Sequence, residues 1–165
     1  MPMTPFHLGP GLLLGALTLK FFNLWAILLG SIIMDIEPTV LLIINPCYSC
    51  PHHGFFHSIL GAILGSMILS VILWLFREKL NQISLKFRIQ QSFSFPVLFF
   101  SSLTAWVLHI FFDSLTHSDV FLFWPLKYNP ILIGPEIYSP MSLIFLIFGF
   151  FGLIIAYKKI KYVRH

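Results

Sequence analysis

Long apolar stretches separated by short polar segments dominate the hydrophobic pattern of this chain of 165 residues. A helix needs about 20 predominantly apolar residues to span a bilayer. Residues 55–76 and 93–114 reach this length, and residues 141–157 form a shorter apolar run that ends against two lysines. The pattern therefore predicts a transmembrane helix in each of these three segments.

The N-terminal apolar region allows two interpretations. Residues 8–34 are apolar apart from Lys20 and Asn23, so they form either one long tilted span or two short helices that meet near these two residues. With two short helices at residues 8–20 and 22–35, the predicted fold is an all-α polytopic membrane bundle of four to five segments.

Composition also indicates an integral membrane protein. Hydrophobic residues make up 58% of the chain and charged residues only 10%, whereas a soluble domain carries about 25% charged residues. The mean hydropathy is +0.90. The first residues lack the basic region of a cleaved signal peptide, so we expect the N-terminus to be retained. We treat residues 1–165 as a single transmembrane domain.

Positive charges predict the orientation, because cytoplasmic loops carry an excess of Lys and Arg. These residues concentrate in the 77–92 connector, a predicted solvated loop, and in the C-terminal tail. Both should face the cytoplasm from the plasma or inner membrane. Residues 35–54 and 113–140 would then form extracytoplasmic loops, with Lys127 their only basic charge apart from histidines. The net charge of +4 thus reflects contacts with anionic lipid and not nucleic-acid binding.

Ionisable side chains gather at the predicted helix ends on that extracytoplasmic side. Such residues are costly at membrane depth and are functional candidates. The clusters are His7; Asp35 and Glu37; His52, His53 and His57; and His109, Asp113, His117 and Asp119. His53 and His57 are four residues apart, a spacing that places both on one face of a helix. His109 and Asp113 share this spacing, so each pair could reach one ion.

Together these clusters predict a metal site, with a structural polar network and a proton or ion path as alternatives. Imidazoles with carboxylates suit Zn, Mn, Fe or Co. The candidates outnumber the three protein ligands of a typical catalytic zinc, so they could hold one or two divalent metal ions. A metal-bound water would then be the nucleophile. Taken singly, His7, His117 and Asp119 also fit interface anchors, caps or turn residues.

The cysteines form a single CxxC motif, Cys47 and Cys50. A zinc ribbon needs a second pair, which is absent, although His52 and His53 would complete a Cys2His2 set. Covalent haem attachment needs a His directly after the second Cys, where this chain has Pro51. A local disulfide and free thiols both remain open.

Several motifs resemble those of a known family. TPFHLGPG, MDIEP, HGFFHS, HIFFDSLTHSD and FWPLKYNP resemble, in this order, the predicted membrane-bound metal-dependent hydrolases of prokaryotes, a broad group that includes the LexA-binding inner-membrane type. The resemblance extends over about residues 4–130. It implies metal ligands at His7, Asp35, His53, His57, His109 and Asp113. It also implies that Trp124, followed by Pro125, walls or anchors the site.

Two motifs depart from the family pattern. Glu37 stands where the family often has a second Asp. His52-His53-Gly54 stands where it often has His-Arg-Gly, so the equivalent ligand could be either histidine. The same change removes a cation that could hold a phosphate.

The resemblance also bears on the N-terminal region. His7 can join Asp35 only if both lie on the same side of the membrane. Residues 8–34 would then form a hairpin of two short helices that turns near Lys20–Asn23. A helix of about 13 residues rises about 20 Å, so such a hairpin would thin the bilayer locally or cross it only in part.

The predicted function is a membrane-embedded, metal-dependent hydrolase that acts on a phosphoester or other ester of a lipid or amphiphile. Asp35 and Glu37 are the candidate catalytic carboxylates, Asp35 as a ligand or bridge and Glu37 as a general base or orienting group. The expected partners are membrane lipid and a lipid or small-molecule substrate, and the oligomeric state is left open. The alternatives are a transporter or metal-ion permease and a non-catalytic membrane scaffold.

Overall fold

The computed structural model describes residues 4–47 and 51–162. Within these residues the chain forms seven α-helices and four short 3-10 helices, and it forms no strand. By length and composition, three helical stretches of these residues could cross a membrane. The number rises to four if the bent α4–α5 pair is counted as one span. The predicted all-α membrane bundle is therefore confirmed.

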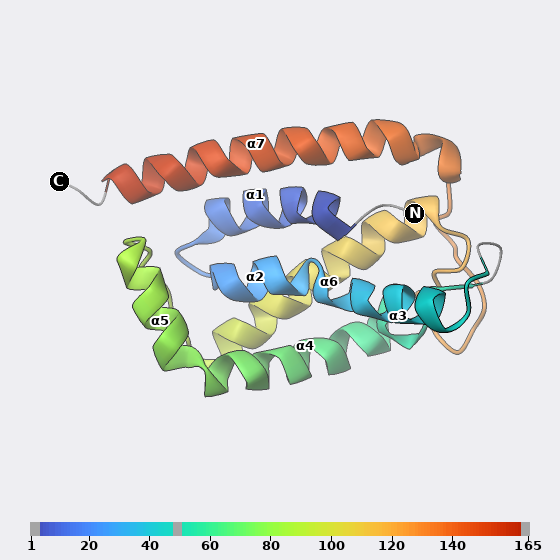
Figure 1. The fold of residues 1–165 in the computed structure, drawn as a ribbon, viewed down its shortest axis with the longest axis horizontal. Helices are drawn as coiled ribbons and strands as arrows, with labels where there is room; N and C mark the ends of the chain where they lie inside the picture. The colour runs from blue at the N-terminus through green and yellow to red at the C-terminus, as the bar shows by residue number, and fades with distance from the viewer. Residues whose placement is uncertain (1–3, 48–50, 163–165) are drawn as a thin grey trace.

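The N-terminal region forms the expected hairpin. Helix α1 (Leu8–Thr18) ends at a turn, and Asn23 begins α2 (Leu24–Gly30) by accepting a hydrogen bond from the backbone N–H of Ala26. The two helices run side by side in opposite directions (Figure 1). Because the chain returns to the end at which it started, the residues before α1 lie close to those after α2.

A helix follows the hairpin where the sequence predicted a loop. After the 3-10 helix η2 (Ile33–Asp35), α3 extends over Ile36–Ile44. The stretch Leu24–Ile44 is 21 residues long and apolar enough to cross a membrane. The expectation of a loop across residues 35–54 is therefore wrong for α3. Pro38 lies in the first turn of this helix, where a missing N–H costs no intrahelical hydrogen bond.

The next two helices meet at a sharp bend. The 3-10 helix η3 (Phe55–His57) leads into α4 (Ile59–Leu75), and α5 (Arg77–Lys86) follows at an angle of 74°. Residues 77–86 of the connector are thus helical; the sequence favoured a solvated loop, with an amphipathic helix on the membrane surface as the alternative. One face of α5 packs on the bundle, where the Trp25 indole N–H donates to the Ser84 hydroxyl at 2.7 Å.

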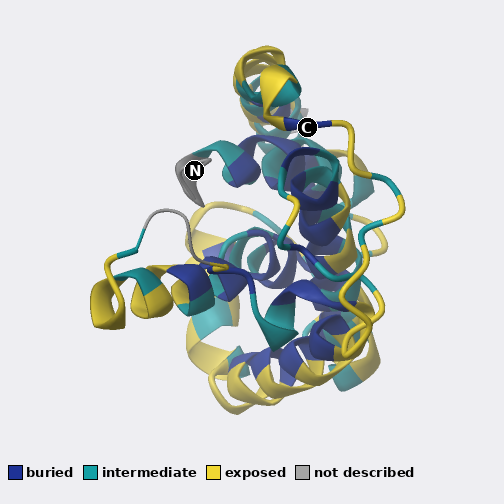
Figure 2. Cartoon of the chain, turned by 90° about the vertical axis from the view of Figure 1, so that its right-hand side faces the viewer, coloured by how far each residue is buried: buried dark blue, intermediate teal, exposed yellow. Residues whose placement is uncertain are grey.

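Helix α6 (Phe95–Thr116) runs through the bundle against α2 and α4. The 3-10 helix η4 (Pro135–Ile137) then leads into α7 (Tyr138–Tyr162), which lies along α1 (Figure 1). Buried residues gather between the helices, and the outward faces of α4 and α7 expose large apolar side chains (Figure 2). Lipid would cover these faces in a membrane.

Close packing of α1 on α7 fixes the N-terminal end of the hairpin. A Cβ atom at Gly9 would overlap the carbonyl oxygen of Phe145, so only glycine permits this approach. The contact also holds His7, the last residue of η1 (Thr4–His7), beside the Phe145 ring, with centroids 5.3 Å apart. The α1–α7 contact therefore positions one of the predicted site residues.

Candidate metal centre

His109 and Asp113 meet on one face of α6, as their spacing predicted. The Nε2 atom of His109 lies 2.9 Å from Oδ2 of Asp113 and 3.1 Å from Oδ1 of Asp35. Its Nδ1 atom lies 2.7 Å from the carbonyl oxygen of Ser31. A carbonyl can only accept, so Nδ1 carries the proton. In the neutral ring, Nε2 then presents a lone pair to two carboxylates.

His57 reaches the same point from η3. Its Nδ1–H donates to Oε2 of Glu37 at 3.2 Å. Its Nε2 atom lies 3.7 Å from Oδ1 of Asp35 and 3.7 Å from Oδ2 of Asp113. This Nε2 atom is buried and has no hydrogen-bond partner. The ring is thus oriented through one nitrogen and leaves the other free for a ligand, as metal-binding histidines do.

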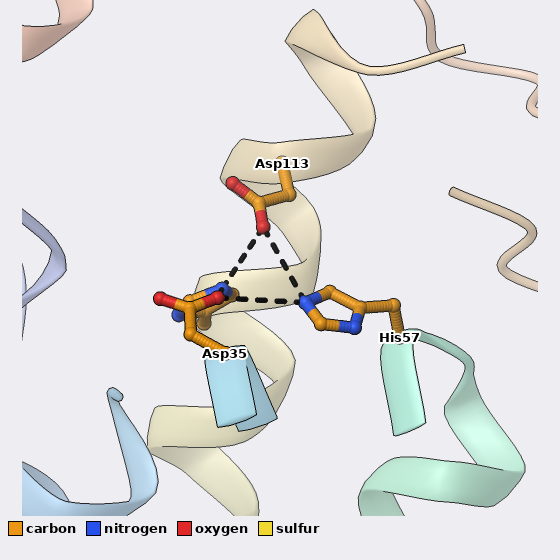
Figure 3. A group of neighbouring side chains, drawn as sticks. Asp35, His57 and Asp113 are labelled. Carbon is orange, nitrogen blue, oxygen red and sulfur yellow. Dashed lines mark hydrogen bonds and ion pairs between the residues drawn. The ribbon is translucent and has the colours of Figure 1, made fainter. Parts of the chain in front are cut away.

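Four donor groups converge from three parts of the chain. Asp35, His57, His109 and Asp113 each offer one ligand atom, and these atoms all lie within 4.8 Å of one another. Figure 3 shows Asp35, His57 and Asp113 facing one another from η2, η3 and α6. Oδ2 of Asp35 and Oδ1 of Asp113 are also buried without a hydrogen-bond partner. Two carboxylates in a buried space need positive charge beside them, supplied by protons on the histidines or by a bound cation, and this donor set fits a divalent metal ion.

The remaining two predicted ligands border this group. Nε2 of His7 lies 3.2 Å from Oδ1 of Asp113, without the geometry of a hydrogen bond. The His7 ring stacks on that of His109, with centroids 3.9 Å apart. Nε2 of His53 lies 4.0 Å from Oδ2 of Asp113. The structure therefore brings all six predicted ligands together, while their role as ligands stays a prediction.

The contacts of Asp119 favour His53 over His52 as the candidate ligand. Oδ2 of Asp119 accepts the backbone N–H groups of both histidines, and Oδ1 accepts Nδ1–H of His53 at 2.9 Å. These bonds turn Nε2 of His53 toward Asp113. The His52 side chain is also buried, but it is not among the side chains whose ligand atoms converge in the described part of the chain.

His117 and Asp119, which the sequence grouped with His109 and Asp113 and which singly also fitted turn residues, lie beside His53. His53, His117 and Asp119 form a second group whose ligand atoms lie within 4.8 Å of one another. Burial and the nearby His53 lower the pKa of His117 to about 4. Its ring is therefore neutral at physiological pH and could bind a metal. Against the effect of burial, the hydrogen bond from His53 holds the pKa of Asp119 below its ordinary value.

Glu37 orients the ring of His57 through its Nδ1 atom, as Asp119 orients the ring of His53. Besides Nδ1–H of His57, the Glu37 carboxylate accepts the backbone N–H groups of Gly54 at 3.1 Å and Phe56 at 3.2 Å. These three hydrogen bonds hold the loop and the His57 ring in place. Of the two roles predicted for Glu37, this geometry fits the orienting group and not the general base.

Replacing Glu37 with glutamine is expected to weaken metal binding roughly 10–100-fold without abolishing it, as for other groups that orient metal ligands. The amide loses the negative charge and turns an N–H group toward the donors of the loop. Titration with Zn²⁺ or Mn²⁺ measures the affinity. The matched change Glu136→Gln, at an exposed position on η4, should leave it unchanged. Equal affinities for the wild type and Glu37→Gln would contradict the orienting role.

Metal binding is expected to release protons, because His57 must lose one. Burial alone would lower its pKa, but the carboxylates of Asp35 and Glu37 outweigh burial and raise this pKa above its ordinary 6.5. Without a metal the ring thus stays protonated at and somewhat above pH 6.5, so apparent affinity should rise with pH through this range. A pH indicator in weak buffer measures the release. Affinity that is independent of pH would exclude His57 as a ligand.

Cys47 and Trp124 are not among the four converging donors. Cys47 is disulfide-bonded, so its thiol is not a zinc ligand here, and Cys50 falls outside the described residues. Trp124 packs edge-on against Phe55 with ring centroids 5.3 Å apart, and it is 44% exposed. This position beside η3 fits an anchor at the membrane interface.

These features define a helical integral membrane protein with a buried cluster of histidines and carboxylates that could hold a metal ion. The chain belongs to the YdjM inner membrane protein family, which it matches over residues 1–164. Searches of curated proteins and of solved structures find no match. The inner-membrane type that the motifs resembled is thereby confirmed, and with the apolar helices it establishes an integral membrane location.

Proposed function

We propose that this protein is a metal-dependent hydrolase that cleaves a phosphoester or other ester of a lipid or amphiphile at the extracytoplasmic membrane surface. One observation carries the proposal: ligand atoms of Asp35, His57, His109 and Asp113 converge in a buried space, where Nε2 of His57, Oδ2 of Asp35 and Oδ1 of Asp113 have no hydrogen-bond partner. A purely structural network would pair such atoms with one another or with donors. The positive charges at the opposite helix ends support the extracytoplasmic placement.

The chain contributes ligands, orientation and a proton acceptor. A divalent ion such as Zn²⁺ or Mn²⁺ supplies a Lewis acid and lowers the pKa of a bound water. Asp35, His57, His109 and Asp113 would hold it, and His7 and His53 would complete the set for one or two ions. Oδ2 of Asp35 has no hydrogen-bond partner, so this oxygen would be available to accept a proton during hydrolysis if Oδ1 held the ion.

A second function, metal-ion transport, is favoured by one observation. Asp35 lies at the break between α2 and α3 within the apolar stretch Leu24–Ile44, and transporters bind ions at broken helices. Against this function, other donors lie at helix ends: His7 precedes α1, His57 precedes α4, and Asp113 lies in the last turn of α6. Sites of transporters usually lie near the bilayer midplane, so we favour the hydrolase.

The test begins with the protein purified in detergent and analysed for bound metal. It is then assayed against a panel of phospholipids, lipid phosphates and soluble phosphoesters, with chelator and after metal is restored. We expect bound metal and a hydrolysis that is lost with chelator and regained with metal. Absence of metal after reconstitution would overturn the proposal. Metal flux in proteoliposomes without hydrolysis of any substrate would favour the transporter.

A further inference from the structure

An apolar groove of about 390 Å³ lies between α3 and α4. Ile33 and Val40 line one wall, Ile68 and Ile72 line the other, and Trp106 of α6 also lines it. Val40, Ile68 and Ile72 are 43%, 47% and 44% exposed, whereas Trp106 is 4% exposed. The buried indole therefore forms the base of a groove whose rims face outward. In an integral membrane protein, outward apolar surfaces face lipid.

Gly65 of α4 allows the Trp106 ring to form the base of this groove. A Cβ atom at Gly65 would overlap the ring of Trp106, so glycine lets the indole lie against the helix. The indole N–H donates to the carbonyl oxygen of Phe56 at 2.9 Å, which ties the base of the groove to η3. From Gly65 to Ile72 the helix rises by about 10 Å along the groove. The groove is therefore elongated and runs along α4.

One end of the groove reaches the candidate metal centre. Glu37 and Phe56 line the groove, and the Glu37 carboxylate binds both the Phe56 backbone N–H and the ring of His57. On the other side of α3, Asp35 lines a second groove of about 430 Å³. A molecule in the first groove would thus have its polar end near the donors and its apolar part between α3 and α4.

We propose that the α3–α4 groove binds an acyl chain of a membrane lipid, whose headgroup ester then lies at the Asp35–His57 end. Among the described residues, Glu37 is the single ionisable one that lines this groove, so a polar ligand would find few partners along its length. The groove opens on the face that lipid covers, and the substrate enters sideways from the bilayer. This inference rests on the proposed function and names its substrate class, a long-chain lipid.

Photolabelling tests this assignment. The chelator-treated protein is placed in phosphatidylethanolamine and phosphatidylglycerol vesicles that contain a phospholipid with a diazirine in its acyl chain. Labelled peptides are identified by mass spectrometry as the mole fraction of the probe rises. We expect labelling of α3 and α4 beside the groove to saturate at a low mole fraction. Labelling of the outer face of α7, which meets only bulk lipid, should rise in proportion to the probe.

Filling the groove provides the matched comparison. Ile68→Trp should cause a several-fold loss of the saturable labelling, and Val40→Trp should do the same from the opposite wall. The control Leu146→Trp, at a 58% exposed position on α7, should retain it. Metal analysis of the untreated variants confirms that the site has folded. It also reports on the proposed function separately, because the labelling itself requires no metal.

Two results would overturn the inference. Labelling that rises in proportion on both faces would mean that the groove holds only bulk lipid. Saturable labelling that persists in both tryptophan variants, or that centres on Thr39 in the second groove, would place the chain elsewhere. Either result together with bound metal would remove the acyl-chain site and leave the hydrolase proposal standing.

Discussion

Asp113→Asn is expected to lose metal binding while the protein remains folded. Oδ2 of Asp113 lies 2.9 Å from Nε2 of His109 and 3.7 Å from Nε2 of His57, and Oδ1 lies 3.2 Å from His7. Asparagine has the same shape but lacks the charge. Because groups that only orient a ligand contribute roughly 10–100-fold to metal affinity, loss of a central ligand should cost more than about 100-fold.

The stability of this variant separates a metal site from a structural network. Asp35 and Asp113 both approach Nε2 of His109, so without a metal their like charges repel. In chelator the protonated His57 offsets this repulsion, so Asp113→Asn should melt at the same temperature as the wild type or lower. With metal present, the wild type should gain about 2.7 kcal/mol at a free metal concentration of 100 times the dissociation constant, and the variant should gain nothing.

Thermal unfolding in detergent, with and without metal, measures both effects. If the cluster were only structural, removing the partner of a buried His109 would cost about 3–5 kcal/mol whether or not metal is present. A matching drop in both conditions would therefore contradict the metal site. Glu78→Gln, which removes one carboxylate charge at an exposed position on α5, is the control and should change neither melting nor metal binding.

Residue spacing predicted which side chains come together, but a shared helix face explains only one of the two pairs. His109 and Asp113 meet because four residues make about one turn of α6. His53 and His57 also meet, with ring centroids 4.6 Å apart. However, His53 precedes Gly54 and η3, so a loop brings them together and not a shared helix face. The same spacing thus marked two pairs that the backbone assembles differently.

Other parts of the site gave little or no signal in the sequence. The carbonyl oxygen of Ser31 fixes the tautomer of His109, and a backbone carbonyl occurs at every position. The sequence grouped His117 with Asp113, four residues earlier, but α6 ends at Thr116, so a shared helix face does not bring His117 to the site. Asp119 enters through hydrogen bonds to a loop more than 60 residues earlier in the chain, a pairing that only the tertiary fold reveals.

The N-terminal hairpin and α3 show how much of the helical structure the apolar pattern of the sequence can predict. Lys20 and Asn23, which interrupt residues 8–34, allowed two short helices as one of two interpretations, and the family resemblance favoured this one. Asn23 does cap α2. The predicted loop after Asp35 contains Pro38, but proline fits the first turn of a helix as well as a loop. Only the tertiary structure, in which this turn packs beside η3, decides between them.

Gly61→Ala is expected to damage both stability and metal binding, although alanine ordinarily favours a helix by about 1 kcal/mol over glycine. A Cβ atom at Gly61 would overlap the carbonyl oxygen of Phe55 and would lie 2.6 Å from the Cα atom of Phe56. Both are backbone atoms of η3, which cannot yield without moving His57. Overpacking of this kind costs about 1–3 kcal/mol, so the steric term should outweigh the helix propensity.

The matched change Gly149→Ala shows whether the steric term is specific. A Cβ atom there would meet its nearest neighbour, the Cα atom of Gly9, at 3.4 Å, an ordinary contact. This variant should be as stable as the wild type or slightly more stable, and should bind metal normally. Gly61→Ala should unfold at a lower temperature and bind metal at least about 10-fold more weakly. A shifted η3 would turn the His57 ring away from the metal, and the effect should resemble the loss of the group that orients this ring. Metal titration measures the affinity, and thermal unfolding measures the stability.

Normal metal affinity in a destabilised Gly61→Ala protein would show that His57 is not held through the contact between α4 and η3.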